Sequence, residues 1–497
     1  MELQFEKKGI GCLHTLLREE KTQEQTQEVR ISDGMPDIGS VIGAWGQVIL
    51  RTKQWSDGQA SVNGGVMAWV LYRAEESGEV CQIESWIPFQ LRWELPPAEK
   101  DGFLHLQCLL RSVDARSTSA RKLMLRTNVS AMLHAMLPQQ AELFVPGQLP
   151  EDIQLKTAQY PVQLPAEAGE KAFTLEETQN LPISSAKPEK LVSYTLQPEI
   201  LDQKVMTDKV VFRGCGLVHI LYLADDGAYY RCDVDLPFSQ YAQLDSEYEE
   251  GVSCSILPCI TTLEAELAEG QVKLKAGLVC QYVICREQKL ELVEDAYSPH
   301  RKVQIRKELL QLPAILESKS QTVRLDAQLS AQAQRAADAV FYPELPELQR
   351  NGDTARVILP GHMQMLYYDP EGLLQCTTKH TQQVLELPLD QEASLYAQAV
   401  PTGKTQVTLG TNTQLSADLL VGLTAMAGQG LPMITALEVG EETEPDPNRP
   451  SLILRRSDGS DLWETAKAAG STVDAIRSAN GLEQDPREGQ ILLIPIV

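Results

Sequence analysis

Apolar and polar residues alternate with a period of two along most of this chain. Between Val272 and Ile284 the apolar side chains occupy every second position, and residues 123–131 and 323–331 follow the same pattern. Such alternation places one face of a strand on a core and the other in water, which is typical of antiparallel sheets. Because few segments before residue 460 follow the 3.6-residue period of a helix, we predict a mainly β protein.

A hairpin-like segment occurs three times, and its tyrosines are 150 and 145 residues apart. Each copy has a Leu-Tyr pair, then a glycine in an acidic or polar stretch, and then a cysteine. The recurring residues are Tyr72, Gly78 and Cys81, then Tyr222, Gly227 and Cys232, then Tyr367, Gly372 and Cys376. The glycine suits a turn that needs a positive φ between two strands. We therefore predict three tandem antiparallel β-rich repeats: residues 1–145 with an N-terminal extension, residues 146–300, and a divergent copy at residues 301–438.

The pattern changes after the third repeat. Residues 439–450 hold three prolines and four acids with almost no apolar side chains, which predicts an extended linker. Beyond it, residues 451–497 contain a short apolar strand at 452–454, two segments with helical spacing near 461–469 and 472–480, and a closing strand at 491–494. This order predicts a small βααβ (α+β) domain.

Composition and charge exclude several classes of protein. The 497 residues are 43% hydrophobic, too many for a disordered chain, and the net charge of −24 disfavours non-specific binding to nucleic acid or to an anionic membrane. The sequence lacks an export signal and a run of ~20 apolar residues, so we expect a protein of the cytoplasm without a membrane span. Ten cysteines without a Cys-x-x-Cys pair predict free thiols and no metal site.

Candidate catalytic motifs have simpler explanations. Gly403-Lys404-Thr405 resembles the end of a phosphate-binding loop, but the first glycine of that motif is missing and we interpret the segment as a β-turn. Ser119 and Lys122 have the spacing of a nucleophile pair, yet they lead into an alternating strand rather than a helix. The seven histidines are scattered along the chain. We therefore predict no enzyme activity, no catalytic residues and no cofactor, and leave open a site formed only by tertiary proximity.

The C-terminal 46 residues resemble a LysM domain. The resemblance runs through GSDLWETAKAAG (459–470), Thr472-Val473, Ile476 and Asn480, and closes on GQILLIP (489–495). It implies a binding surface on two loops that grip N-acetylglucosamine chains in that family, or a peptide from a protein partner. The residues implied are Asp458, Gly459, Ser460, Asp461 and Leu462 in the first loop, and Asn480, Gly481, Leu482 and Glu483 in the second.

Two features of the LysM-like segment bear on this expectation. Ser460-Asp461 inverts the usual order of acid and hydroxyl, and Thr465 replaces the customary isoleucine, both at or beside the first loop. Trp463, flanked by Leu462 and Ala466 at helical spacing, is interpreted as a core residue rather than a ligand contact, because so small a unit must bury its few large side chains.

The repeats resemble the SPOCS domain of sporulating Firmicutes over most of residues 25–440. The opening TQEVRISDGMPDIGSVIGAWGQVILRTKQ (26–54) and the segment DKVVFRGCGLVHILY (208–222) carry the resemblance. Several such domains followed by one LysM domain resemble a family of spore coat morphogenetic proteins. That resemblance implies an assembly adaptor in the mother-cell cytoplasm, whose LysM domain docks on the morphogenetic ATPase at the forespore surface and whose repeats contact coat proteins or one another. The alternative is a protein that binds peptidoglycan through the LysM domain.

Overall fold

The computed structural model describes the chain except residues 1, 4, 98–101, 148, 182–186, 250–251, 269, 331, 390–392, 411, 443–449 and 460. Strands dominate the described residues, which confirms the predicted mainly β class, and the helices in this part of the chain are confined to the C-terminal end. Neither helix has the length and apolar character that crossing a membrane requires.

The same strand pairing occurs three times along the chain. The first strand set comprises β2 (Phe5–Arg30), β3 (Ile38–Ser56), β4 (Gln59–Ala74), β5 (Val80–Glu94), β6 (Phe103–Ser119) and β7 (Lys122–Pro146). The second comprises β8 (Gln154–Asn180), β9 (Pro188–Val205), β10 (Lys209–Ala224), β11 (Tyr229–Gln243), β12 (Ser253–Ala268) and β13 (Gln271–Tyr297). In each set the third strand pairs with the second and fourth, and the sixth strand pairs with the first and fifth, always antiparallel.

The third strand set follows this order with one strand broken in two. It comprises β14 (Arg301–Leu329), β15 (Arg335–Pro343), β16 (Glu347–Asn351), β17 (Thr354–Tyr368), β18 (Leu374–Pro388), β19 (Ser394–Thr408) and β20 (Thr413–Glu442). Strands β15 and β16 pair with successive parts of β17, where β3 and β9 are continuous in the other sets. The short β1 (Glu2–Leu3) adds to β20.

Each set contains the hairpin turn that the sequence predicts. Gly78, Gly227 and Gly372 have φ angles of 69°, 76° and 79°, in the left-handed region that side chains rarely enter. Their N–H groups donate to carbonyl oxygens three or four residues earlier, at 3.1, 2.9 and 3.0 Å. The prediction of a glycine-dependent turn is therefore confirmed at all three positions.

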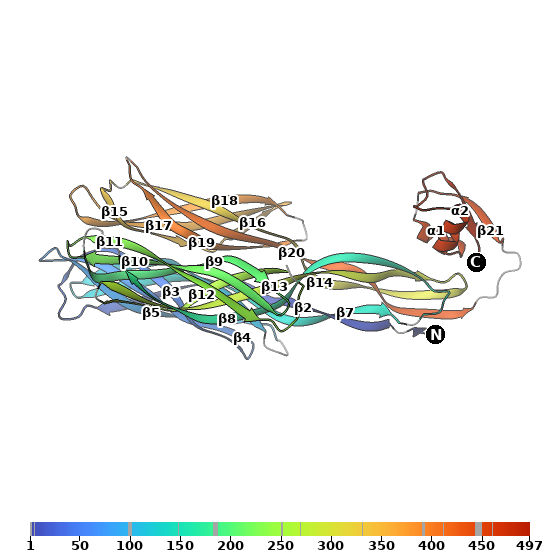
Figure 1. The fold of residues 1–497 in the computed structure, drawn as a ribbon, viewed down its shortest axis with the longest axis horizontal. Coiled ribbons are helices and arrows are strands. Elements are labelled where there is room, and N and C mark those ends of the chain that lie inside the picture. The colour runs from blue at the N-terminus through green and yellow to red at the C-terminus, as the bar shows by residue number, and fades with distance from the viewer. Residues whose placement is uncertain are drawn as a thin grey trace.

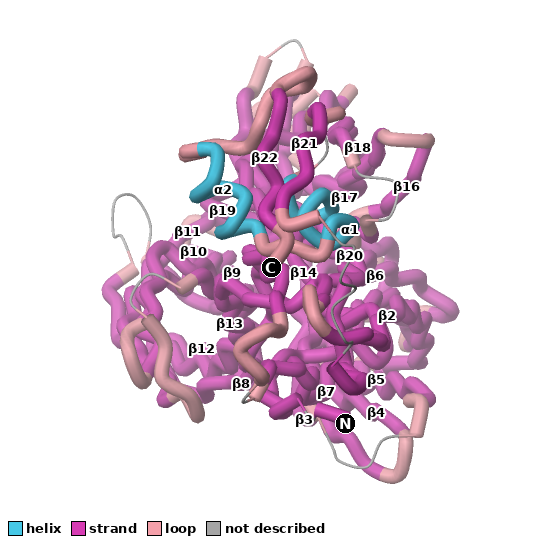
Figure 2. Tube along the Cα trace, turned by 90° about the vertical axis from the view of Figure 1, so that its right-hand side faces the viewer, coloured by secondary structure: helices cyan, strands magenta, loops and turns pink. Residues whose placement is uncertain are grey.

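The three sets pack against one another side by side to form a body. Viewed from the end, their sheets surround a common axis (Figure 2). The Gly46 N–H of the first set donates to the Tyr342 hydroxyl of the third, and the Leu196 N–H of the second donates to Gln47 Oε1 of the first, at 3.2 and 3.0 Å. One apolar cluster also contains buried residues from every set, among them Trp69. The sets therefore share a core rather than standing as separate beads.

Six long strands extend from one end of the body as a stalk (Figure 1). They are the first and last strands of each set, which have 25 to 30 residues. Their apolar faces meet in what we call the stalk cluster: Ile10, Cys12, Leu143, Val162, Leu164, Leu290, Leu292, Leu310, Leu312, Ala314, Leu431 and Met433. Burial of these side chains joins all three sets, because each strand pair alone would leave its apolar face in water.

The C-terminal unit lies beside the outer end of the stalk (Figure 1). It consists of β21 (Leu452–Arg456), α1 (Leu462–Ala469), α2 (Val473–Asn480) and β22 (Ile491–Pro495), the order that the sequence predicts. Thr472 caps α2 by accepting from the Ala475 N–H, and Gly481 ends that helix with φ 61°. Strand β20 continues through Glu442, so residues 439–442 of the predicted linker belong to the sheet, while 443–449 lie outside the described residues.

Truncation of Leu312 tests whether the stalk cluster holds the three sets together. Leu312 is 1% exposed, so Leu312→Ala leaves a cavity and should cost about 2–5 kcal/mol of unfolding free energy. Leu309 lies on the same strand but is 62% exposed, and Leu309→Ala should change stability by no more than about 0.5 kcal/mol. Chemical denaturation followed by circular dichroism measures both, and equal midpoint shifts would contradict a shared buried cluster.

Candidate functional site

The first predicted binding loop lies between β21 and α1. Asp458 and Gly459 are exposed, whereas Leu462 is 1% exposed and belongs to the core of the C-terminal unit. Ser460 lies outside the described residues. Asp461 caps α1, since its Oδ1 accepts the Trp463 N–H at 3.0 Å. Among the described residues of this loop, Leu462 is therefore buried, whereas Asp458, Gly459 and Asp461 are exposed.

The second predicted loop follows α2. Gly481 and Glu483 are exposed, and the half-buried Leu482 packs on the core of the unit. The Asn480 side chain joins α2 to β22: its Nδ2 donates to the carbonyl oxygens of Ile476 and Leu493 at 2.8 and 2.6 Å, and its Oδ1 accepts the Leu493 N–H at 2.8 Å. These bonds hold the loop in place and occupy the amide that could otherwise meet a ligand.

Charged side chains lie beside both loops. Hydrogen bonds from Lys156 Nζ and from the Trp463 N–H hold the pKa of Asp461 below its usual range, and the nearby charge of Arg477 on α2 acts in the same direction. Arg477 also forms an ion pair with Asp485 at 3.2 Å, just after the second loop. An anionic group is therefore retained beside the first loop across the physiological pH range.

The C-terminal unit is fixed to the stalk through a buried acid, Asp295. Asp295 Oδ2 accepts from Trp463 Nε1 at 2.8 Å and from Lys467 Nζ at 2.7 Å. Lys307 Nζ lies 3.6 Å from the second carboxylate oxygen. Although burial raises the pKa of Asp295, these hydrogen bonds and charges outweigh it and hold the pKa below the usual value. The ionised carboxylate is the centre of the contact.

Three further interactions complete this docking contact. The Tyr297 ring meets the Trp463 ring edge to face, with centroids 4.7 Å apart, and the Tyr297 hydroxyl donates to the Ser471 carbonyl oxygen at 3.0 Å. Lys156 Nζ donates to Asp461 Oδ2 at 2.6 Å. Trp463 is 7% exposed, which confirms it as a core residue, and the stalk residues Tyr297 and Asp295 contribute to its surroundings. Sequence reasoning missed Lys156, Asp295 and Tyr297, because no local pattern marks a contact across more than 160 residues.

The substitution Asp295→Asn tests the docking contact. It keeps the shape of the side chain and removes the charge that Lys467 and Lys307 share, and a hydrogen bond to a charged group is worth about 1.5–3 kcal/mol. Amide hydrogen exchange over α1 should accelerate by about tenfold or more. Asp235→Asn, an exposed acid on β11, is the matched control and should leave α1 unchanged. Unaltered protection in Asp295→Asn would refute a charge-dependent contact.

A cavity of about 610 Å³ lies where the body meets the stalk, lined by residues of all three sets. Arg18 reaches into it and stacks on the Tyr396 ring, 4.0 Å from the centroid. Burial, and to a smaller extent the charges of Lys53 and Arg18 respectively, lower the pKa values of His105 and His134 to about 3. Both imidazoles are therefore neutral at physiological pH.

These two histidines predict a loss of stability in acid. Above pH about 6.5 they are neutral in both the folded and the unfolded chain. As the pH falls towards 3 the unfolded chain gains protons that the folded state excludes, so the free energy of unfolding decreases. The double variant His105→Gln/His134→Gln should show a shallower decline between pH 6.5 and 4 in denaturation experiments. A profile as steep as that of the original protein would contradict this assignment.

Tertiary structure brings together three residues that could hold a metal. Among the described residues, Glu344, His362 and His380 form a group whose ligand atoms lie within 4.8 Å of one another. They belong to the third strand set, far from the C-terminal unit (Figure 1). The prediction of no metal site rested on the spacing of cysteines and histidines along the chain, which does not show residues that meet only in the folded protein. The ten cysteines are free thiols.

A comparison with protein families identifies part of the body. Residues 187–268 match a family model described as "SipL, SPOCS domain". The matched segment spans β9 to β12, the four strands between the two long stalk strands of the second set. No curated protein and no solved structure matches the chain. This segment of the second strand set is therefore similar to a SPOCS domain, and the similarity suggests a protein related to sporulation and the spore coat.

Proposed function

We propose that this protein is a non-enzymatic adaptor in the assembly of the spore envelope. The observation that carries the proposal is the SPOCS match in the second strand set. In this proposal the adaptor lies in the mother cell, on the forespore surface. The body presents sheet surfaces to coat proteins or to other copies of the chain, and the C-terminal unit binds the morphogenetic ATPase of the coat basement layer.

The first and third strand sets are proposed to be SPOCS domains as well, with the boundaries 1–145 and 301–438 that the sequence suggests. Two observations support this. Strands β3 to β6 and β15 to β19 occupy the same places in the pairing order as the matched strands β9 to β12. The glycine turn also recurs at Gly78 and Gly372 with similar φ angles.

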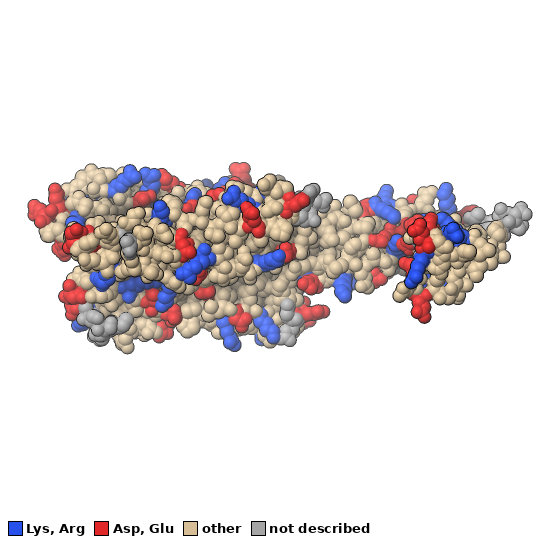
Figure 3. Space-filling view, turned by 90° about the horizontal axis from the view of Figure 1, so that it is seen from above, with Lys and Arg blue, Asp and Glu red and all other residues tan. Residues whose placement is uncertain are grey.

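The C-terminal unit is proposed to be a LysM domain that recognises a protein. Its βααβ order and the motif order in the sequence support this assignment. The exposed residues Asp458, Gly459, Gly481 and Glu483 would form the contact surface. Acidic and basic side chains are interspersed on the face in Figure 3, and both kinds gather on the C-terminal unit. The mixed charge on this face suits a polar protein partner.

Binding of the full-length chain to two immobilised targets tests this proposal. The purified coat-basement ATPase is one target and purified peptidoglycan is the other. We expect saturable binding to the ATPase and about tenfold weaker binding by Glu483→Lys, because the substitution reverses a charge on the proposed surface. Glu347→Lys makes the same charge change on exposed β16 of the body and should bind like the original chain.

Two results would overturn the proposal. Retention by peptidoglycan without binding to the ATPase would make the C-terminal unit a glycan-binding LysM domain, the alternative that the sequence leaves open. Equal losses for Glu483→Lys and Glu347→Lys would show that general electrostatics, rather than the second loop, governs the interaction.

A further inference from the structure

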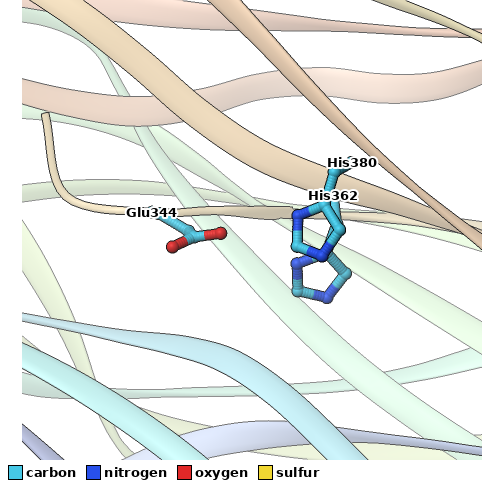
Figure 4. Close-up of side chains that lie close together, drawn as sticks. All are labelled: Glu344, His362 and His380. Carbon is cyan, nitrogen blue, oxygen red and sulfur yellow. The ribbon is translucent and has the colours of Figure 1, made fainter.

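His362 and His380 face each other across two neighbouring strands. They are direct partners in the β17–β18 ladder, and their ring centroids lie 5.6 Å apart. Glu344 directly follows β15 on the other side of β17, where its N–H donates to the Pro360 carbonyl oxygen at 3.0 Å. Figure 4 shows the two imidazoles close together, with the Glu344 carboxylate pointing towards them. Glu344, His362 and His380 therefore lie close together, although they come from three separate segments of the chain.

The buried member of the pair has an unsatisfied nitrogen. His362 is 6% exposed, and its Nδ1 has no hydrogen-bond partner. Buried polar atoms of this kind are uncommon in native proteins and call for a specific explanation, such as a bound ion. Tyr342 stacks on the His362 ring with centroids 5.0 Å apart, so the imidazole is held in a fixed orientation.

The carboxylate is oriented from another strand set. Arg111 on β6, in the first set, forms an ion pair with Glu344 Oε2. The same carboxylate points towards the imidazoles (Figure 4). A partner of this type fixes a metal-binding carboxylate in the way that outer groups do in known metal sites. The positive charge of Arg111 also opposes a cation, so affinity should be weaker than in a closed structural zinc site.

We propose that Glu344, His362 and His380 form a site for a divalent transition-metal ion of the zinc class. Two imidazoles and one carboxylate suit Zn²⁺, Co²⁺ or Ni²⁺, whereas Ca²⁺ and Mg²⁺ prefer sets of oxygen ligands. Ligand atoms in a tetrahedral zinc site lie about 3.3 Å apart, given metal–ligand bonds of about 2.0–2.2 Å. Binding must therefore draw the three side chains together from their present separations of up to 4.8 Å.

The ion would connect parts of the body that are distant in sequence. It would bridge β17 and β18 directly and reach the first strand set through the Glu344–Arg111 ion pair. Its fourth position stays open to water or to a residue of a partner. The site is independent of the C-terminal unit and of the function proposed for it.

Titration of the full-length, chelator-treated chain with Co²⁺ and Zn²⁺ tests the site. We expect one equivalent of Co²⁺ to give the visible absorption of a low-coordinate nitrogen and oxygen site, Zn²⁺ to displace it, and the melting temperature to rise. His380→Ala should weaken binding at least tenfold. Because His380 is exposed, this variant should remain folded. His14→Ala, another exposed histidine on a strand, is the matched control and should bind normally.

The ten free cysteines offer a competing explanation, and the Co²⁺ spectrum distinguishes it. A thiolate charge-transfer band would place the metal on cysteine and overturn the proposal. Equal affinity in His380→Ala and the original chain would do the same, as would the absence of saturable binding to either ion. Magnesium at the same concentration should neither compete with Co²⁺ nor raise the melting temperature.

Discussion

The mutual burial of six long strands is the constraint on which the rest of this structure depends. The first and last strands of each set are longer than the strands between them and carry apolar side chains on one face. Two strands alone cannot bury that face, so the three pairs must meet one another. The contact between the three pairs forms the stalk and aligns the three sets around one axis. The C-terminal unit docks at the outer end of this stalk.

Docking changes how the C-terminal unit would work as an adaptor. A unit on a long free linker searches for its partner, whereas here Asp295, Tyr297 and Lys156 fix its orientation on the stalk. Asp461, at the edge of the proposed surface, is already paired with Lys156. A partner that contacts the first loop must therefore bind beside this ion pair or compete with it, while the second loop remains accessible. In the proposed adaptor, this arrangement would hold the body and the C-terminal unit at a set distance from each other.

Much of the C-terminal unit could be predicted because its signals are local. Gly470 ends α1, and Thr472 and Gly481 cap α2; the effect of such residues extends over only about one helical turn. The candidate binding loops remain a prediction. Leu462 and Asn480 match a family motif, yet one fills the core and the other bonds β22. A motif conserves residues for folding as well as for binding, and the sequence alone does not separate the two.

The sequence by itself determined the strand periodicity, the three recurring glycine turns and the βααβ order of the C-terminal end. These follow from the conformational preferences of residues and from contacts between neighbours along the chain. Only the tertiary structure decided which strands share the stalk cluster, that Asp295 receives Trp463 and Lys467, and that His362 lies beside His380 and Glu344. The physical reason is that an apolar face specifies burial without specifying its partner, and that charged or metal-binding side chains meet only after the sheets have packed.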